Sequence, residues 1–205
     1  MTSWPTTRGV MAIGDDRDRI LELGRRLAHS GKADSVIVHI AHEGWDRRFV
    51  AALRAIGRVD ELAPAVEPVA TWGLWETEFR RVKAYGRSWA NGERSPGVGM
   101  VFGVWRHPEL SHAQFDAHWR DIHAPLAIEH HVGMWDYTQC SFRRPLVDQA
   151  IDYDGVAICQ FPTLEDLQER FYGSPESEQA IGEDVVKFGD ANRLDRVRMS
   201  EYVLC

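Results

Sequence analysis

The chain has 205 residues, 44% of them hydrophobic, and carries a formal net charge of −7. Its length suits one large domain or two small ones, either of which can bury a hydrophobic core. The negative charge argues against nucleic acid and anionic membrane surfaces as partners, because both attract basic faces, and it is compatible with a small uncharged or weakly polar ligand.

The first 42 residues predict a strand, a helix and a second strand. A short apolar run over residues 8–14 is typical of a strand. Residues 15–32 predict a helix, because acids open the segment, apolar residues recur at helical spacing and Gly31 provides a stop. The β-branched run over residues 33–42 predicts the second strand.

The rest of the first half predicts a second helix and an extended segment. Residues 44–62 favour a helix, because apolar residues from Phe49 onward form a stripe at helical spacing. Residues 65–79 look extended, although Pro68 makes part of them an edge or irregular strand. The order β-α-β-α-β gives residues 1–90 the character of a degenerate ferredoxin-like half.

A stretch rich in turn-forming residues, 86–97, marks the expected boundary between two domains. Residues 97–108 then predict a strand that ends at a proline. A helix is expected over residues 111–131, because Ser111 begins a capping-box pattern. Pro125 should kink or divide this helix.

The remaining elements complete a ferredoxin-like order for residues 97–205. We expect three further strands and two further helices, the strands at 134–142, 155–161 and 194–204 and the helices at 164–174 and 176–190. The resulting order β-α-β-β-α-β is the split βαβ plan. We therefore predict an α+β fold in which two ferredoxin-like units join their sheets into one barrel.

The most informative stretch of the chain is the histidine-rich helix. Phe115, His118 and Trp119 share one helical face, and His123 lies close to that face, four residues beyond Trp119. Pro125 removes a backbone donor just after His123. A histidine placed there can reach a cavity and exchange protons at neutral pH.

This stretch, FDAHWRDIHAPLA, resembles the signature of EthD-domain proteins of the dimeric α/β-barrel superfamily. The resemblance covers residues 97–205, and the first half has no matching motif. It implies a half-barrel that pairs with another to enclose a mostly apolar cavity. Relatives in the superfamily include dehydratases, cyclases, lactone isomerases and cofactor-free monooxygenases, and heme-binding relatives exist as well.

Each candidate residue also has a structural interpretation. His123 is either a general acid/base or a histidine bonded to free carbonyls at a helix end. His118 fits helix packing as well as substrate contact, and His39 is either a satisfied core group or a pocket residue. Tyr137 shares a strand face with Trp135, so it either orients a substrate oxygen inside the barrel or packs in the core.

Our leading hypothesis is a cofactor-independent lyase, dehydratase or isomerase acting on a hydrophobic aromatic or polyketide-like molecule. His123 would move the proton, and Tyr137 and His39 would bind a carbonyl or hydroxyl oxygen. The alternatives are an oxidoreductase, as a cofactor-free or heme-assisted monooxygenase, and a non-catalytic accessory binding protein of a degradation pathway. The residues expected to contact substrate are His118, Trp119, Trp135, Trp105 and Phe102.

The remaining expectations concern metals, location and assembly. No metal is expected, because the acids near His123 do not complete a ligand set and the three cysteines are widely spaced. Few cysteines, no signal-peptide pattern and no long apolar run indicate a cytoplasmic protein. Pairing through the sheets, as is common in the superfamily, leads us to expect a homodimer.

Overall fold

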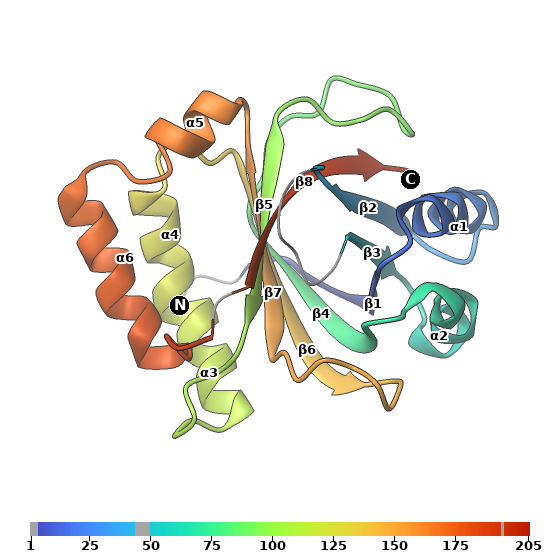
Figure 1. The fold of residues 1–205 in the computed structure, drawn as a ribbon, viewed down its shortest axis with the longest axis horizontal. Helices are drawn as coiled ribbons and strands as arrows, with labels where there is room; N and C mark the ends of the chain where they lie inside the picture. The colour runs from blue at the N-terminus through green and yellow to red at the C-terminus, as the bar shows by residue number, and fades with distance from the viewer. Residues whose placement is uncertain (1–3, 44–49, 194) are drawn as a thin grey trace.

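The computed structural model describes residues 4–43, 50–193 and 195–205. In these residues eight strands form a closed barrel (Figure 1). The strands are β1 (Thr6–Gly14), β2 (Ser35–Ala41), β3 (Ala51–Ile56), β4 (Gly73–Lys83), β5 (Val98–Val104), β6 (Asp136–Pro145), β7 (Gly155–Phe161) and β8 (Asp195–Val203).

The helices cover two opposite sides of the barrel. Figure 1 shows α1 and α2 on one side and α3 to α6 on the other. Two short irregular helical segments, the 3₁₀ turn η1 and the π-helical η2, adjoin α2 and α3. The bounds are α1 (Arg17–His29), α2 (Val59–Val66), η1 (Glu67–Val69), α3 (His112–His118), η2 (Trp119–His123), α4 (Ala124–His130), α5 (Leu164–Glu169) and α6 (Pro175–Phe188).

The strand order divides the barrel into two equivalent units. Around the barrel the strands run β1-β3-β2-β8-β5-β7-β6-β4. The first unit therefore reads β4-β1-β3-β2 and the second β8-β5-β7-β6, which is the same ferredoxin-like order. Antiparallel pairing of β2 with β8 and of β4 with β6 joins them. The fold is thus α+β, with both units in one chain.

The predicted helix over residues 44–62 is wrong for residues 51–56, which form β3, whereas residues 59–62 are helical and belong to α2. Phe49 lies outside the described residues. Leu53 packs under the helices of the first unit, whereas Ala52 faces the barrel interior. A strand buried on both faces is apolar almost throughout, so its sequence imitates a helical stripe. The first unit therefore has the order β-α-β-β-α-β.

The expected elements of the second half each have a counterpart in the structure. β5 to β8 occupy the expected strand segments, although β6 continues to Pro145, into an expected loop. Residues 84–97 connect β4 to β5, and the division into two domains at this segment stays a prediction. Within the described residues, no helix is long and apolar enough to cross a membrane.

The barrel interior is filled, contrary to the expected enclosed cavity. Met11, Trp75 and Phe142 are buried there among other apolar side chains, and the rings of Trp75 and Phe142 stack with centroids 4.4 Å apart. Met11, Trp75 and Phe142 each expose 3% or less of their surface, so within the described part of the chain these side chains pack against one another and not around a ligand. A second apolar layer lies under α1 and α2, and a third lies between the second unit's sheet and its helices.

Candidate active site

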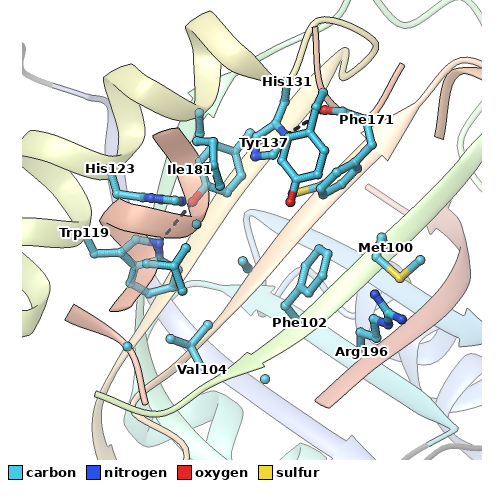
Figure 2. Close-up of a pocket in the computed structure, with 18 of the residues that line it drawn as sticks. Met100, Phe102, Val104, Trp119, His123, His131, Tyr137, Phe171, Ile181 and Arg196 are labelled. Carbon is cyan, nitrogen blue, oxygen red and sulfur yellow. Dashed lines mark hydrogen bonds between the residues drawn. The ribbon is translucent and has the colours of Figure 1, made fainter. Parts of the chain in front are cut away.

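The third layer contains a pocket of about 850 Å³ (Figure 2). Its floor is the outer face of the second unit's sheet, and its walls are the helical segments η2, α4, α5 and α6. The lining is mostly apolar, with a few polar groups, as is typical of small-molecule sites. Lining residues used below are Met100, Phe102, Trp119, His123, His131, Tyr137, Ala157, Cys159, Phe188 and Arg196.

The wall that carries His123 is a helix whose hydrogen-bond register changes midway. Ser111 and Gln114 form the expected capping box at its start. In η2 the Ala124 N–H bonds to the Trp119 carbonyl, five residues back. Pro125 divides the helix as expected, because it has no N–H to continue this pattern to the Arg120 carbonyl. Short π-helical segments of this kind often occur at functional sites.

A tryptophan from the N-terminal segment satisfies the carbonyl that Pro125 leaves open. Trp4 Nε1 donates a hydrogen bond to the Arg120 oxygen at 3.1 Å. An unpaired buried carbonyl would cost free energy, so this contact stabilises the register change. The π-helical turn, and with it the place of His123 in the pocket wall, is thereby held from outside the helix.

Asp184 of α6 binds two histidines of the facing helix. His123 Nδ1 lies 3.0 Å from Asp184 Oδ2, and His118 Nε2 lies 2.8 Å from Asp184 Oδ1. Burial alone would raise the pKa of Asp184, but the hydrogen bonds from His123 and His118 outweigh it and hold the pKa below its ordinary value. The carboxylate is therefore ionised at neutral pH.

The ionised carboxylate determines the histidine tautomer. A carboxylate only accepts hydrogen bonds, so the facing His123 Nδ1 carries the proton. Nε2 of the neutral ring is then a free base at the pocket wall, where Figure 2 shows His123 on the same side as Tyr137. The Phe188 ring packs against the imidazole, with centroids 4.9 Å apart, and restricts its motion.

Tyr137, on β6, presents a hydroxyl group whose acceptor positions are both used. Trp119 Nε1 and Gln139 Nε2 each donate to it at 3.1 Å. A hydroxyl has two lone pairs and one proton, so the remaining O–H is left to donate. Burial raises the pKa of Tyr137 well above its ordinary value, which keeps the group protonated at neutral pH.

A buried arginine of the first unit fixes the amide that supports Tyr137. Arg80 of β4 donates to Gln139 Oε1 at 2.7 Å and pairs with Asp116 at 3.0 Å. Because the amide oxygen faces Arg80, the amide nitrogen faces Tyr137 and the Trp119 carbonyl. The first unit therefore contributes to the site through this support.

A second histidine, His131, lines the pocket beyond the end of α4. Its Nδ1 lies 2.8 Å from the Phe171 carbonyl oxygen, so Nδ1 carries the proton. Burial lowers the pKa of His131 to about 4. His131 is therefore neutral at physiological pH and adds no charge to the pocket.

The structure brings five of the eight predicted site residues to the pocket: His123, Tyr137, Trp119, Trp105 and Phe102. Their roles stay predictions. Tyr137 faces the helices, away from the filled barrel interior in which the sequence hypothesis placed it. His118 is not among the lining residues, but it bonds to Asp184 and stacks on the ring of Phe188, which lines the pocket.

Two predicted site residues lie elsewhere. Trp135 precedes the first residue of β6, so strand alternation does not apply to it, and it stacks on Tyr85 with ring centroids 4.6 Å apart. His39 lies on the inward face of β2, inside the barrel, and is fully buried. Burial, followed by the charge of Arg54, lowers the pKa of His39 well below its ordinary value.

Asp184 is the main site residue that sequence reasoning missed. Ile181, Asp184 and Phe188 recur at helical spacing and are all buried on α6. An acidic residue within an apolar stripe was therefore an available signal, but its partner lies 61 positions away in the chain. In the described part of the chain, no three His, Cys, Asp or Glu side chains are placed to hold a metal ion.

Comparisons with known proteins agree with this architecture. No curated protein matches the chain. An anthrone oxidase-like protein of known structure is similar in fold, with a TM-score of 0.59 and 13% identity over 98% of this chain and 91% of that chain. A variant of chlorite dismutase from Candidatus Nitrospira defluvii has a TM-score of 0.51 and 12% identity over 97% and 92%.

The sequence match is more specific and lies in the second unit. Residues 107–192 match the EthD domain family. They include the histidine-rich helix and Tyr137, which contribute polar groups to the pocket lining, and Asp184, which bonds to His123 behind it. The second unit is therefore similar to the EthD domain family over residues 107–192, and that family belongs to the dimeric α/β-barrel superfamily.

Proposed function

We propose that this protein is an enzyme that moves a proton on a hydrophobic aromatic or polyketide-like carbonyl compound, as a cofactor-independent lyase, dehydratase or isomerase. The observation that carries the proposal is the hydrogen bond between His123 Nδ1 and Asp184 at 3.0 Å. It makes Nε2 a base at the wall of an apolar pocket. A base fixed by a carboxylate is a common arrangement for general acid/base catalysis.

The proposed step uses one base and one oxygen partner. His123 Nε2 takes a proton from a carbon next to a substrate carbonyl, the electron pair of the C–H bond forms a C=C bond, and the π pair of the carbonyl moves onto its oxygen. The Tyr137 O–H donates to that oxygen, and ionised Asp184 stabilises the imidazolium. Return of the proton at another carbon completes an isomerisation, and loss of a neighbouring hydroxyl as water completes a dehydration.

The apolar walls support this chemistry physically. Hydrogen bonds and charges act more strongly where water is excluded, so one hydroxyl donor has a large effect on a developing oxyanion. Trp119 and Phe102 add flat apolar surface suited to aromatic rings.

The test is turnover of a panel of aromatic carbonyl and hydroxyl compounds. For any compound that is converted, we expect His123→Gln to reduce kcat by about a hundredfold or more and Tyr137→Phe to reduce it by a smaller factor. His130→Gln is the matched control, because His130 lies on the same helix, bonds to Ser177 and is not among the lining residues. Equal turnover in the His123 and His130 variants would contradict the proposal. Binding of a compound without its conversion would favour an accessory binding protein.

Heme-assisted oxygenation is a second candidate, favoured by the same histidine. His123, with Nδ1 bonded to a carboxylate, would hold the iron of a bound heme through Nε2. Bound heme would supply the chemistry of O₂ activation and one-electron transfer. Absorbance spectra before and after addition of hemin test this: a Soret band that is lost in His123→Ala supports heme, and no band leaves the proton-transfer proposal ahead.

A further inference from the structure

The pocket has a charged edge on the side away from His123. It is formed by β8, whose inward residues Val197 and Met199 pack in the barrel interior. Strand alternation therefore directs Arg196 and Arg198 to the outer face, and both line the pocket. Figure 2 shows Arg196 beside Met100 and Phe102.

The strand register places the arginines of β8 in the same rows as Tyr137 and Gln139 of β6, with apolar residues between them. One row of paired residues runs Tyr137, Cys159, Met100, Arg198, and the next runs Gln139, Ala157, Phe102, Arg196. The middle members of each row are apolar and face the pocket. The floor between Tyr137 and the arginines is thus an apolar surface on which a flat ring system can lie.

The width of this floor sets the size of a ligand that reaches both ends. β6 and β8 are separated by β7 and β5, which makes three strand spacings, or about 14 Å between backbones. The side chains of Tyr137 and Arg196 shorten the span. Two or three fused aromatic rings with a short polar substituent would bridge it.

Arg196 is the cation available for a ligand. Arg193 is held by Asp152, at 2.7 and 2.8 Å, and lies over the Trp105 ring. Within the described part of the chain, Arg196 makes no hydrogen bond or ion pair. Arg196 is exposed to solvent at the pocket edge, so its guanidinium can bind an anion there without giving up a partner among these residues.

We infer that Arg196 binds a carboxylate on the substrate, at the end remote from the group that reacts at His123. This rests on the proposed function and narrows its substrate class to fused-ring aromatic acids of two or three rings. It also departs from the uncharged or weakly polar ligand that the net charge of −7 was compatible with, because arginine side chains line this edge of the pocket.

Two acidic residues also line the pocket, Glu178 on α6 and Asp190 just beyond the end of that helix. Burial raises the pKa of Tyr172, and the charges of Glu178 and Arg196 act on it in opposite directions. Both charges thus lie within electrostatic reach of one hydroxyl. A carboxylate ligand should be attracted by Arg196 and repelled by Glu178. Neutralising Arg196 should therefore weaken its binding, and neutralising Glu178 should tighten it.

The experiment compares naphthoate with naphthamide, which has the same rings without the charge. Binding is measured by titration calorimetry on the full chain. We expect the wild type to prefer naphthoate, Arg196→Gln to weaken naphthoate binding at least about tenfold, and naphthamide binding to change less than about twofold. Glu178→Gln should tighten naphthoate binding, and Arg25→Gln, an exposed change on α1, should leave both probes unaffected.

Equal affinity of the wild type for both probes, or no binding of either, would overturn the inference. So would an Arg196 variant that behaves like the Arg25 variant. Because binding is measured without turnover, a failure of the proposed function leaves this result intact: naphthoate preference lost in Arg196→Gln supports the inference even if no compound is converted.

Discussion

At the scale of single residues, Asp184 organises the candidate site. Its two oxygens accept hydrogen bonds from His118 and His123, and these bonds keep its pKa below the ordinary value. The carboxylate orients the base and stabilises it when it is protonated. Replacing the Asp184 carboxylate by an amide of the same shape should therefore lower catalysis more than substrate binding.

We expect Asp184→Asn to lower kcat by about a hundredfold or more with a much smaller change in KM, because the base loses its orientation and its counter-charge. Steady-state kinetics on a converted substrate measure this. Glu183→Gln is the matched control, since Glu183 is exposed on the same helix and accepts a hydrogen bond from Gln179, away from the histidines. A parallel loss in both variants would mean that α6 is perturbed as a whole.

Burial of His131 makes the free energy of unfolding fall as the pH is lowered. Its pKa is lowered by burial to about 4, from an ordinary value of 6.5. Between these values the unfolded chain binds the proton and the folded chain does not. The contribution of neutral His131 is therefore fully present above pH 6.5 and is lost as the pH falls toward 4.

We expect His131→Gln to flatten the pH dependence of the unfolding free energy in that range. Urea titrations at a series of pH values provide the measurement. The variant will also lose some stability at neutral pH, so the slope is the relevant quantity. A slope identical to that of the wild type would show that His131 is not held neutral in the folded state.

At the scale of elements, the π-helical turn depends on a contact from outside its helix. Trp4 donates to the carbonyl that Pro125 leaves open. We expect Trp4→Phe to destabilise the fold by about 1 kcal/mol, because it keeps a large ring and deletes the donor. Denaturant unfolding measures the change.

Trp135→Phe is the matched control for this change. The Trp135 Nε1 atom has no hydrogen-bond partner among the described residues, so the substitution deletes no bond. If both variants lose the same stability, the loss reflects ring size, and the hydrogen bond to Arg120 does not support the turn.

Sequence patterns predicted most helices and strands of the second half correctly. Alternation and turn chemistry located the strands of the second half, and the capping box located the start of the histidine-rich helix. The same reasoning failed at residues 51–56, because an apolar strand buried on both faces has no alternation to read.

At the scale of the whole molecule, both sheet junctions are made within one chain. β2 pairs with β8 and β4 pairs with β6, so no described strand has a free edge. The homodimer stays a prediction, and it would have to use a surface other than the sheet edges. Sedimentation at several protein concentrations would test it.

We expect the two units to unfold together. Each would expose half of the barrel interior and two strand edges if it opened alone, which is unfavourable. Coincident transitions by far-UV and near-UV circular dichroism would agree with one cooperative unit. A populated intermediate that retains the signal of one half would contradict this expectation.

The sequence by itself determined the α+β class, the ferredoxin-like order of the second half, and the helix that carries His123, because these depend on local periodicity, caps and a short motif. Only the tertiary structure decided where the pocket lies. The filled barrel interior moved Tyr137 to the helical side, and left His39 away from the site. Asp184, Arg80 and Arg196 joined the site through contacts between residues far apart in the chain, which a local pattern does not encode.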